Sequence, residues 1–173
     1  TICLVGSEMC IRDRPKAAKI IELGVPSKKQ EKNWFRTWEK RLPEPGNITF
    51  FDRSWYSRAL IQPSMGYCSE SQYKYFMRKV NEWEFNLIED GLIIIKFYLS
   101  ISKENQEIRF NFRQNNDLKY WKLSPNDWKA HNNWQLITDY KEQMFKKTST
   151  QAAPWIVICL LYTSPSPRDR SSS

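Results

Sequence analysis

The sequence contains one histidine, five glycines and no apolar run long enough to cross a membrane. A single histidine argues against a histidine-based metal site and against a Ser-His-Asp triad. The low glycine and proline counts exclude collagen-like and glycine-rich low-complexity chains. The longest apolar stretches, residues 91–99 and 152–162, fall short of the roughly 20 residues that span a bilayer. We therefore expect no membrane partner.

The glycines also form no phosphate-cradling loop, because none of them lies in a G-x-x-x-x-G-K-S/T pattern. The composition of the chain instead indicates one basic domain. Its 173 residues favour a single domain, and 27 Lys and Arg against 19 Asp and Glu give a formal net charge of +8. Such a surplus predicts a polyanionic partner.

Both ends of the chain look foreign to the domain. Residues 4–14 (LVGSEMCIRDR) can be encoded by DNA whose reverse complement encodes residues 159–168 (CLLYTSPSPR). Such complementarity is typical of read-through into a sequencing adaptor, which belongs with tags and fusion scars rather than with the fold. We predict that segments 1–14 and 159–173 are adaptor-derived and that the domain occupies residues 15–158.

Within residues 15–158 the only cysteine is Cys68, which excludes an intrachain disulfide. A reducing compartment, the cytoplasm, is therefore expected. The basic surplus persists when the two end segments are left out, so it belongs to the predicted domain.

The order of apolar runs and periodic segments predicts an α/β domain. Near-continuous apolar runs indicate buried strands, and apolar residues at helical spacing indicate helices. We expect strands at residues 19–23, 48–51, 92–99 and 155–158, and helices at residues 27–42, 69–90, 103–113 and 128–147. Strands that alternate with helices favour one open, parallel sheet joined by right-handed crossovers.

A polar segment follows the expected strand at residues 48–51, and ligands in open α/β sheets bind beyond the carboxyl ends of the strands. Asp52, Arg53 and Arg58 fall in that segment. A carboxylate there can hold Mg²⁺ directly or through water, and the two guanidinium groups can pair with phosphate oxygens. The alternative is structural, with Asp52 capping the following turn and both arginines solvated.

A second basic segment runs over residues 106–127. Arg109 and Arg113 are four apart and share a helix face, and Lys119 and Lys122 follow in a polar connection. Few acidic residues lie among them, which favours a surface for phosphates. An ordinary solvated helix face is the alternative.

The eight tryptophans admit a different class of function. Basic patches with interleaved aromatic residues can bind single-stranded nucleic acid by stacking, which needs exposed rings. Four tryptophans instead recur on apolar helical faces, where packing in the core is expected: Trp34, Trp38, Trp83 and Trp134. His131 stands alone at an expected helix start, which favours a structural role.

Several motifs resemble the polyphosphate kinase 2 family. FFDRSWYSRA (residues 50–59) is similar to the second acidic motif of that family, which commonly reads FDRSWYNRA. Three further segments resemble its next block, its lid and its last strand, respectively MGYCSESQY (residues 65–73), residues 96–127 and APW (residues 153–155). The resemblance covers almost all of residues 15–158, although Ser57 stands where the family commonly has asparagine.

The resemblance implies a P-loop kinase-like three-layer fold with a parallel sheet and a helical lid at about residues 103–132. It also implies transfer of a phosphoryl group between inorganic polyphosphate and a nucleotide, with Mg²⁺ as cofactor. The WYSRA continuation is similar to the subgroup acting on nucleoside diphosphates. A nucleoside monophosphate acceptor, or a basic nucleic-acid-binding module, remains as the alternative. The fold would be truncated, because the phosphate loop and the first central strand should precede Pro15.

The resemblance also implies roles for single residues. Asp52 would hold Mg²⁺ or the acceptor phosphate, Arg53 would contact a phosphate, and Arg109 would complete the catalytic set. The expected phosphate-binding residues are Arg58, Arg113, Lys119 and Lys122. A linear polyanion accounts for the net charge without nucleic acid, and a homo-oligomer is compatible with this assignment.

Overall fold

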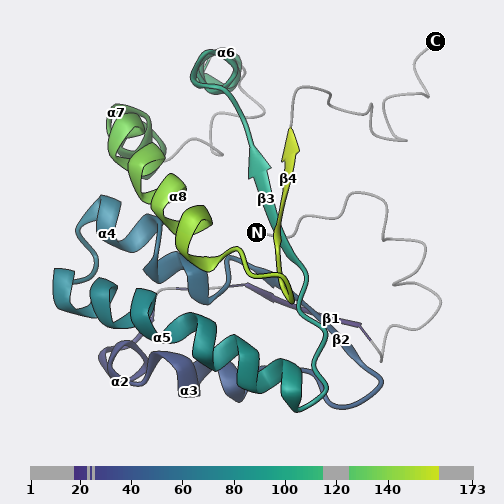
Figure 1. The fold of residues 1–173 in the computed structure, drawn as a ribbon. Helices are drawn as coiled ribbons and strands as arrows, with labels where there is room; N and C mark the ends of the chain where they lie inside the picture. The colour runs from purple at the N-terminus through teal and green to yellow at the C-terminus, as the bar shows by residue number, and fades with distance from the viewer. Residues whose placement is uncertain (1–17, 23, 25, 115–124, 160–173) are drawn as a thin grey trace, which may run out of the picture.

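The computed structural model describes residues 18–22, 24, 26–114 and 125–159 (Figure 1). Its strands are β1 (Ala18–Glu22), β2 (Ile48–Asp52), β3 (Lys96–Ser100) and β4 (Trp155–Cys159). Its helices are α2 (Lys28–Lys32), α3 (Trp34–Glu39), the 3₁₀ helix η1 (Trp55–Arg58), α4 (Ile61–Met65), α5 (Glu70–Glu89), α6 (Lys103–Gln114), α7 (Pro125–Asn132) and α8 (Trp134–Thr148). Strands alternate with helices, as the sequence predicts for an α/β fold.

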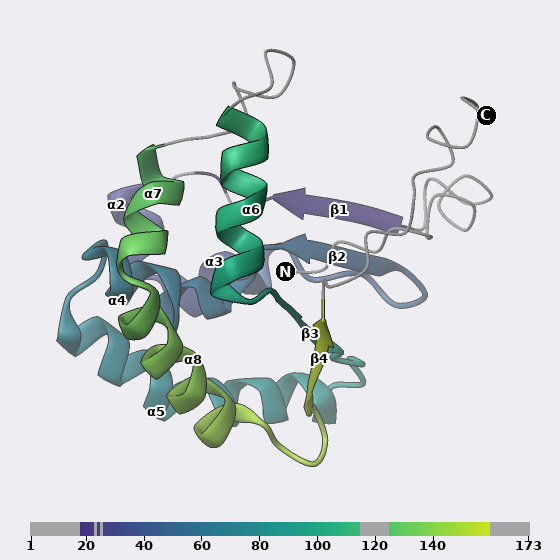
Figure 2. The ribbon, with the colours of Figure 1, turned by 90° about the horizontal axis from the view of Figure 1, so that it is seen from above.

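The four strands form two separate parallel pairs, whereas the sequence predicts a single open sheet. β1 pairs with β2, starting with Ala18 opposite Ile48, and β3 pairs with β4, starting with Lys96 opposite Trp155. Figure 2 shows that the two pairs run in different directions. The described residues contain no further strand that could join β2 to β3 through a hydrogen-bonded ladder.

The strand predicted at residues 92–99 begins only at Lys96. Its partner β4 begins opposite Lys96, so residues 92–95 have no strand to pair with in the described part of the chain. The amide of Leu92 instead donates to the carbonyl of Leu87 near the end of α5, at 3.0 Å. Ile93 is consequently exposed, at 86%.

The helix predicted from Ser69 is α5. Its first turn is closed by a capping box between Ser69 and Gln72. The helix ends just before Gly91, whose φ of 92° lies in the left-handed region that glycine favours. The helix predicted at residues 103–113 is α6. None of the described helices combines the length with the apolar composition needed to cross a bilayer.

Two other predicted helices are interrupted in the structure. Residues 27–42 contain α2 and α3, and residues 128–147 fall within α7 and α8. An asparagine, Asn33 or Asn133, lies at each break and precedes a helix without capping it through its side chain. Asparagine is a weak helix former because its side chain competes for backbone hydrogen bonds.

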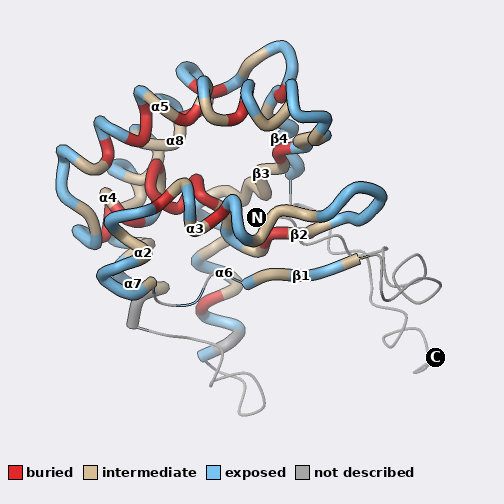
Figure 3. Tube along the Cα trace, turned by 90° about the horizontal axis from the view of Figure 1, so that it is seen from below, coloured by how far each residue is buried: buried red, intermediate tan, exposed pale blue. Residues whose placement is uncertain are grey.

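Aromatic side chains dominate the core, which lies where the helices gather beside the strands (Figures 1 and 3). Trp38 of α3 and Phe76 of α5 are 0% and 1% exposed. Trp34 is also buried, as predicted, whereas Trp83 and Trp134 are half-buried. Removing this apolar area from water is the main driving force that holds the helices against the strands.

Candidate active site

The polar segment after β2 forms a tight turn at the carboxyl end of the strand. Asp52 is the last residue of β2 and is half-buried, and Arg53 follows it with an exposed side chain. The φ of Arg53 is 63°, and no other described non-glycine residue has a positive φ. Ser54 then caps η1 by accepting a hydrogen bond from the amide of Tyr56, at 3.4 Å. The cap is therefore Ser54, and Asp52 does not take the capping role considered as an alternative.

A left-handed backbone is unfavourable for arginine because the Cβ atom crowds a neighbouring carbonyl, at a cost of roughly 1–2 kcal/mol. Such strained residues concentrate at functional sites, where the surrounding structure imposes the conformation. Among the described residues, no hydrogen bond or ion pair holds the side chain of Asp52 or Arg53. Both groups are thus available to a ligand.

Hydrogen bonds from the core fix the segment that follows the turn. Trp34 Nε1 donates to the carbonyl of Trp55 at 3.0 Å. The Tyr56 hydroxyl accepts from Lys96 Nζ at 3.2 Å. Burial, together with the nearby Glu84 carboxylate, raises the pKa of Tyr56, so its hydroxyl stays protonated at neutral pH. These bonds hold the residues that follow the turn against α3 and β3.

Glu22 is a residue of this edge that sequence reasoning missed. It ends β1 and lies directly opposite Asp52 in the parallel pair, so both carboxylates project from the same edge. Its side chain is exposed. The predicted strand at residues 19–23 already contained Glu22, but the register that brings it to Asp52 depends on pairing between distant residues.

Arg58 does not join Asp52 and Arg53. Its side chain is 2% exposed, and its Nη2 donates to the carbonyl of Glu31 at 3.1 Å. The guanidinium lies over the Trp34 ring, 4.3 Å from the ring centre, and burial lowers its pKa. This placement corrects the solvated alternative, because Arg58 packs η1 against α2 and α3. The phosphate contact of Arg58 stays a prediction.

The basic residues of the expected lid lie on another element. Arg109 and Arg113 belong to α6, which follows β3 and stands apart from α3, α5 and α8 (Figure 1). Arg109 is half-buried and takes part in interactions of its own. Lys119 and Lys122 lie outside the described residues. The structure thus brings together Asp52 and Arg53 and places the lid arginines on a separate helix.

Contacts with α7 hold α6 in place. The ring of Phe110 lies 5.4 Å from that of Trp128, centre to centre. Nδ1 of His131 lies 2.9 Å from Oε1 of Gln106, which agrees with the structural role predicted for this histidine. These contacts hold α6, which carries Arg109, against α7.

Comparison with known proteins decides the family. Residues 10–160 match the family model described as polyphosphate kinase 2. The chain belongs to the polyphosphate kinase 2 family. The family membership that the motifs at residues 50–59 and 65–73 predict is thereby confirmed.

This polyphosphate kinase 2 chain is similar to several curated phosphotransferases. It is 43% identical over 145 residues to a GDP-polyphosphate phosphotransferase of Pseudomonas aeruginosa, covering 83% of this chain and 41% of the relative. It is 38% identical over 148 residues to NDP-polyphosphate phosphotransferase 1 of Ruegeria pomeroyi, covering 85% and 48%. An ADP-polyphosphate phosphotransferase of Pseudomonas aeruginosa is also 38% identical over 148 residues, covering 85% and 49%. The chain spans about half the length of these relatives.

Solved structures of the family have the same fold. A polyphosphate kinase 2 from Arthrobacter aurescens superposes with a TM-score of 0.76 at 31% identity, covering 83% of this chain and 51% of the other. One from Pseudomonas aeruginosa gives a TM-score of 0.77 at 30% identity, covering 88% and 34%. The P-loop kinase-like α/β fold class predicted from the sequence is confirmed.

Proposed function

We propose that this chain serves in phosphoryl transfer between inorganic polyphosphate and a nucleoside diphosphate, ADP or GDP. The observation that carries the proposal is its 43% identity, over 145 residues, to a protein named GDP-polyphosphate phosphotransferase. The turn after β2 supports it, because an exposed Arg53 and a half-buried Asp52 stand at a strand end with no partner among the described residues.

The chemistry assigned to the turn is positioning and neutralisation of charge. A transferred phosphoryl group spreads negative charge over its oxygens, and the protein stabilises that charge rather than forming bonds to it. The planar guanidinium of Arg53 can donate two parallel hydrogen bonds to one phosphate. Asp52, one residue earlier, would hold the metal ion or orient the acceptor phosphate.

The carboxylates at this edge suit Mg²⁺. The ion commonly binds through one or two carboxylates together with water and substrate phosphates. Asp52 and Glu22 offer two carboxylates on neighbouring strand ends, and we assign Asp52 as the ligand, directly or through water. No cluster of three or more metal-binding side chains exists among the described residues, so phosphate and water oxygens would complete the shell. When bound, Mg²⁺ would supply charge neutralisation at the phosphoryl group.

We assign polyphosphate contacts to the lid, through Arg109, Arg113, Lys119 and Lys122. A spacing of four places the two arginines on one face of α6, where they can bind successive phosphates of a linear polyanion. The net charge of +8 favours such a ligand over long range. Nucleic-acid binding by stacking finds less support, because Trp34 and Trp38 are buried.

The experiment that tests this function is a chimera. In this chimera, residues 18–159 replace the matching segment of the Pseudomonas aeruginosa GDP-polyphosphate phosphotransferase. The remainder of the chimera comes from that relative. We expect the chimera to form nucleoside triphosphate from polyphosphate with GDP or ADP. A chimera that folds by circular dichroism but forms no triphosphate would overturn the proposal. One that phosphorylates AMP or GMP alone would support the monophosphate alternative.

The proposal extends to location and assembly. We propose that the enzyme works in the cytoplasm, which the free thiol of Cys68, the one cysteine of the predicted domain, supports. A homo-oligomer is part of the same proposal, and light scattering during size-exclusion chromatography would test it.

A further inference from the structure

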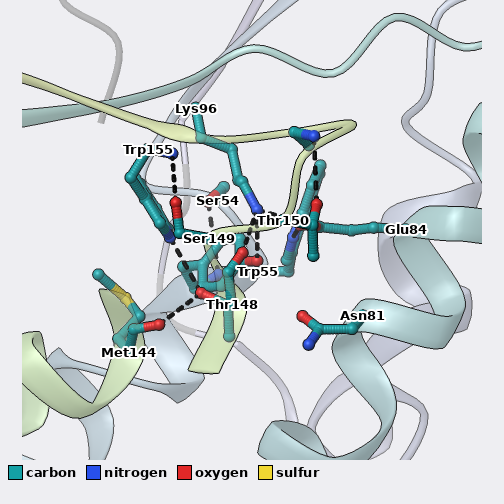
Figure 4. A network of polar contacts seen from close by, with 12 residues as sticks. Ser54, Trp55, Asn81, Glu84, Lys96, Met144, Thr148, Ser149, Thr150 and Trp155 are labelled. Atoms are coloured by element: carbon teal, nitrogen blue, oxygen red, sulfur yellow. Dashed lines mark hydrogen bonds and ion pairs between the residues drawn. The ribbon is translucent and has the colours of Figure 1, made fainter. Parts of the chain in front are cut away.

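A buried ion pair, Lys96–Glu84, is hydrogen-bonded to the residues that follow the Asp52–Arg53 turn (Figure 4). Lys96 Nζ of β3 is 2.9 Å from Glu84 Oε2 of α5, and the two side chains are 4% and 2% exposed. The ammonium also donates to the carbonyl of Thr148, at the end of α8, at 2.7 Å. Three elements that are distant in the sequence therefore meet at one pair of charges.

The Lys96–Glu84 pair is hydrogen-bonded to Trp55 and Tyr56, the two residues that follow Ser54. Trp55 Nε1 donates to Glu84 Oε1 at 2.9 Å, so the two oxygens of Glu84 serve Trp55 and Lys96 separately. Lys96 Nζ in turn donates to the hydroxyl of Tyr56 at 3.2 Å. Two consecutive residues are thus tied to the same pair, immediately after Arg53 and Ser54.

Stability alone does not explain charges at this position. Moving a charge out of water costs several kcal/mol, and well-packed apolar side chains in place of a buried pair are often equally stable. Burial lowers the pKa of Lys96, although the Glu84 carboxylate opposes this change. What the pair supplies, and apolar packing does not, is a set of directional hydrogen bonds.

The strained backbone of Arg53 requires hydrogen bonds that hold the neighbouring residues in a fixed geometry. Its left-handed backbone is strained, and the Ser54 cap next to it is long, at 3.4 Å. A turn with that strain relaxes unless the residues after it are held in place. The bonds to Trp55 and Tyr56 hold them from the core.

We propose that the Lys96–Glu84 pair is a positioning device that, through Trp55 and Tyr56, keeps the Asp52–Arg53 turn in the geometry that binds phosphate. Lys96 and Glu84 are positioning residues and touch no substrate themselves. This inference rests on the proposed function, because it takes Arg53 as a phosphate contact.

The test compares two tryptophans. Trp55→Phe removes the bond to Glu84 and keeps an aromatic ring in the core. Trp83→Phe is the control, because Trp83 Nε1 donates to Glu39 Oε1 at 2.8 Å, an exposed indole–carboxylate bond that does not involve the turn. The substitution keeps an aromatic ring against Trp55, whose ring centre lies 5.1 Å from that of Trp83. We expect Trp55→Phe to weaken binding of tripolyphosphate to the 173-residue chain about tenfold by titration calorimetry, and Trp83→Phe to leave it unchanged.

A second readout reports the turn itself. The three-bond coupling between the amide and Cα protons of Arg53, measured by NMR, depends on its φ. It should change in Trp55→Phe and stay as in the wild type in Trp83→Phe. Equal couplings in both variants would overturn the positioning role, whether or not tripolyphosphate binds.

Arg53→Ala separates this inference from the proposed function. If Arg53 contacts phosphate, Arg53→Ala weakens tripolyphosphate binding, and Trp55→Phe added to it causes no further loss. Unchanged binding in Arg53→Ala would instead refute the proposed function. Weakened binding in Arg53→Ala but not in Trp55→Phe would refute the positioning role alone.

Discussion

Glu22 and Asp52 lie directly opposite each other at the carboxyl ends of β1 and β2. Arg53 follows Asp52 immediately and is exposed. Carboxylates that suit a hard cation and a guanidinium that suits phosphate therefore share one edge. A metal-bound phosphate would meet both kinds of group there.

Replacing Asp52 tests the catalytic role of this edge. In the chimera, Asp52→Asn should lower turnover about 100-fold, equivalent to ~3 kcal/mol of transition-state stabilisation. Unfolding by urea should be little changed, because the substitution is nearly isosteric. Glu22→Gln should mainly raise the Mg²⁺ concentration that gives half-maximal rate. Turnover near that of the wild type in Asp52→Asn would leave Asp52 without a catalytic role.

Because the backbone of Arg53 is strained, we expect its replacement by glycine to raise stability and to weaken ligand binding. Arg53→Gly should stabilise the chain by about 1 kcal/mol, because glycine accepts a positive φ without steric cost. The same variant should bind tripolyphosphate more weakly. Arg36→Gly, at an exposed position inside α3, should instead destabilise by about 1 kcal/mol. Urea unfolding measures both, and equal losses would show that the backbone of Arg53 is not strained.

The lid arginines should contribute more than general basicity. In the chimera, Arg109→Ala or Arg113→Ala should each reduce turnover with polyphosphate by about 10-fold or more, because charge-assisted contacts exceed the ~0–1 kcal/mol of exposed ion pairs. Lys146→Ala, an exposed basic residue of α8, is the control and should have little effect. All rates should be taken at one ionic strength, since salt screens long-range attraction. Three equally mild effects would contradict the assignment of the lid.

Burial of Tyr56 predicts a loss of stability in alkali. Burial raises the pKa of Tyr56 above its ordinary value of 10.0. The unfolded chain therefore releases the proton first, so this stability is present below pH 10 and is lost as the pH rises. Relative to Tyr56→Phe, the wild type should lose up to about 1.4 kcal/mol for each pH unit above that value.

The comparison between these two chains isolates Tyr56, because Lys96 is common to both. Urea unfolding between about pH 9 and about pH 11 measures the difference. Tyr75→Phe, at a tyrosine that is 52% exposed, should follow the wild type. If Tyr56→Phe also follows the wild type at every pH, Tyr56 titrates as an exposed tyrosine does.

Local sequence patterns predicted where helices and strands lie better than they predicted which strands and side chains meet. Apolar periodicity and capping residues located α5 and α6, because helices depend on nearby residues. The late start of β3 and the opposition of Glu22 to Asp52 depend on pairing between distant residues, which periodicity does not report. Arg58 illustrates the same limit, since an arginine in a polar motif gives no local sign that Trp34 will cover it. Asp52 and Arg53 could be proposed as ligands from the sequence because strand ends are where ligands bind, and their roles stay predictions.

The pairing of β4 bears on how copies of the chain associate in solution. This strand, Trp155–Cys159, contains no charge and no proline, and it pairs only with β3 among the described residues. Ile156 and Val157 on it are 42% and 54% exposed. An apolar strand that pairs on one side is a template for a second copy, and we expect mutual repulsion between chains of net charge +8 to oppose that contact. Added salt would screen this repulsion, so the isolated chain should be most prone to cluster at high ionic strength.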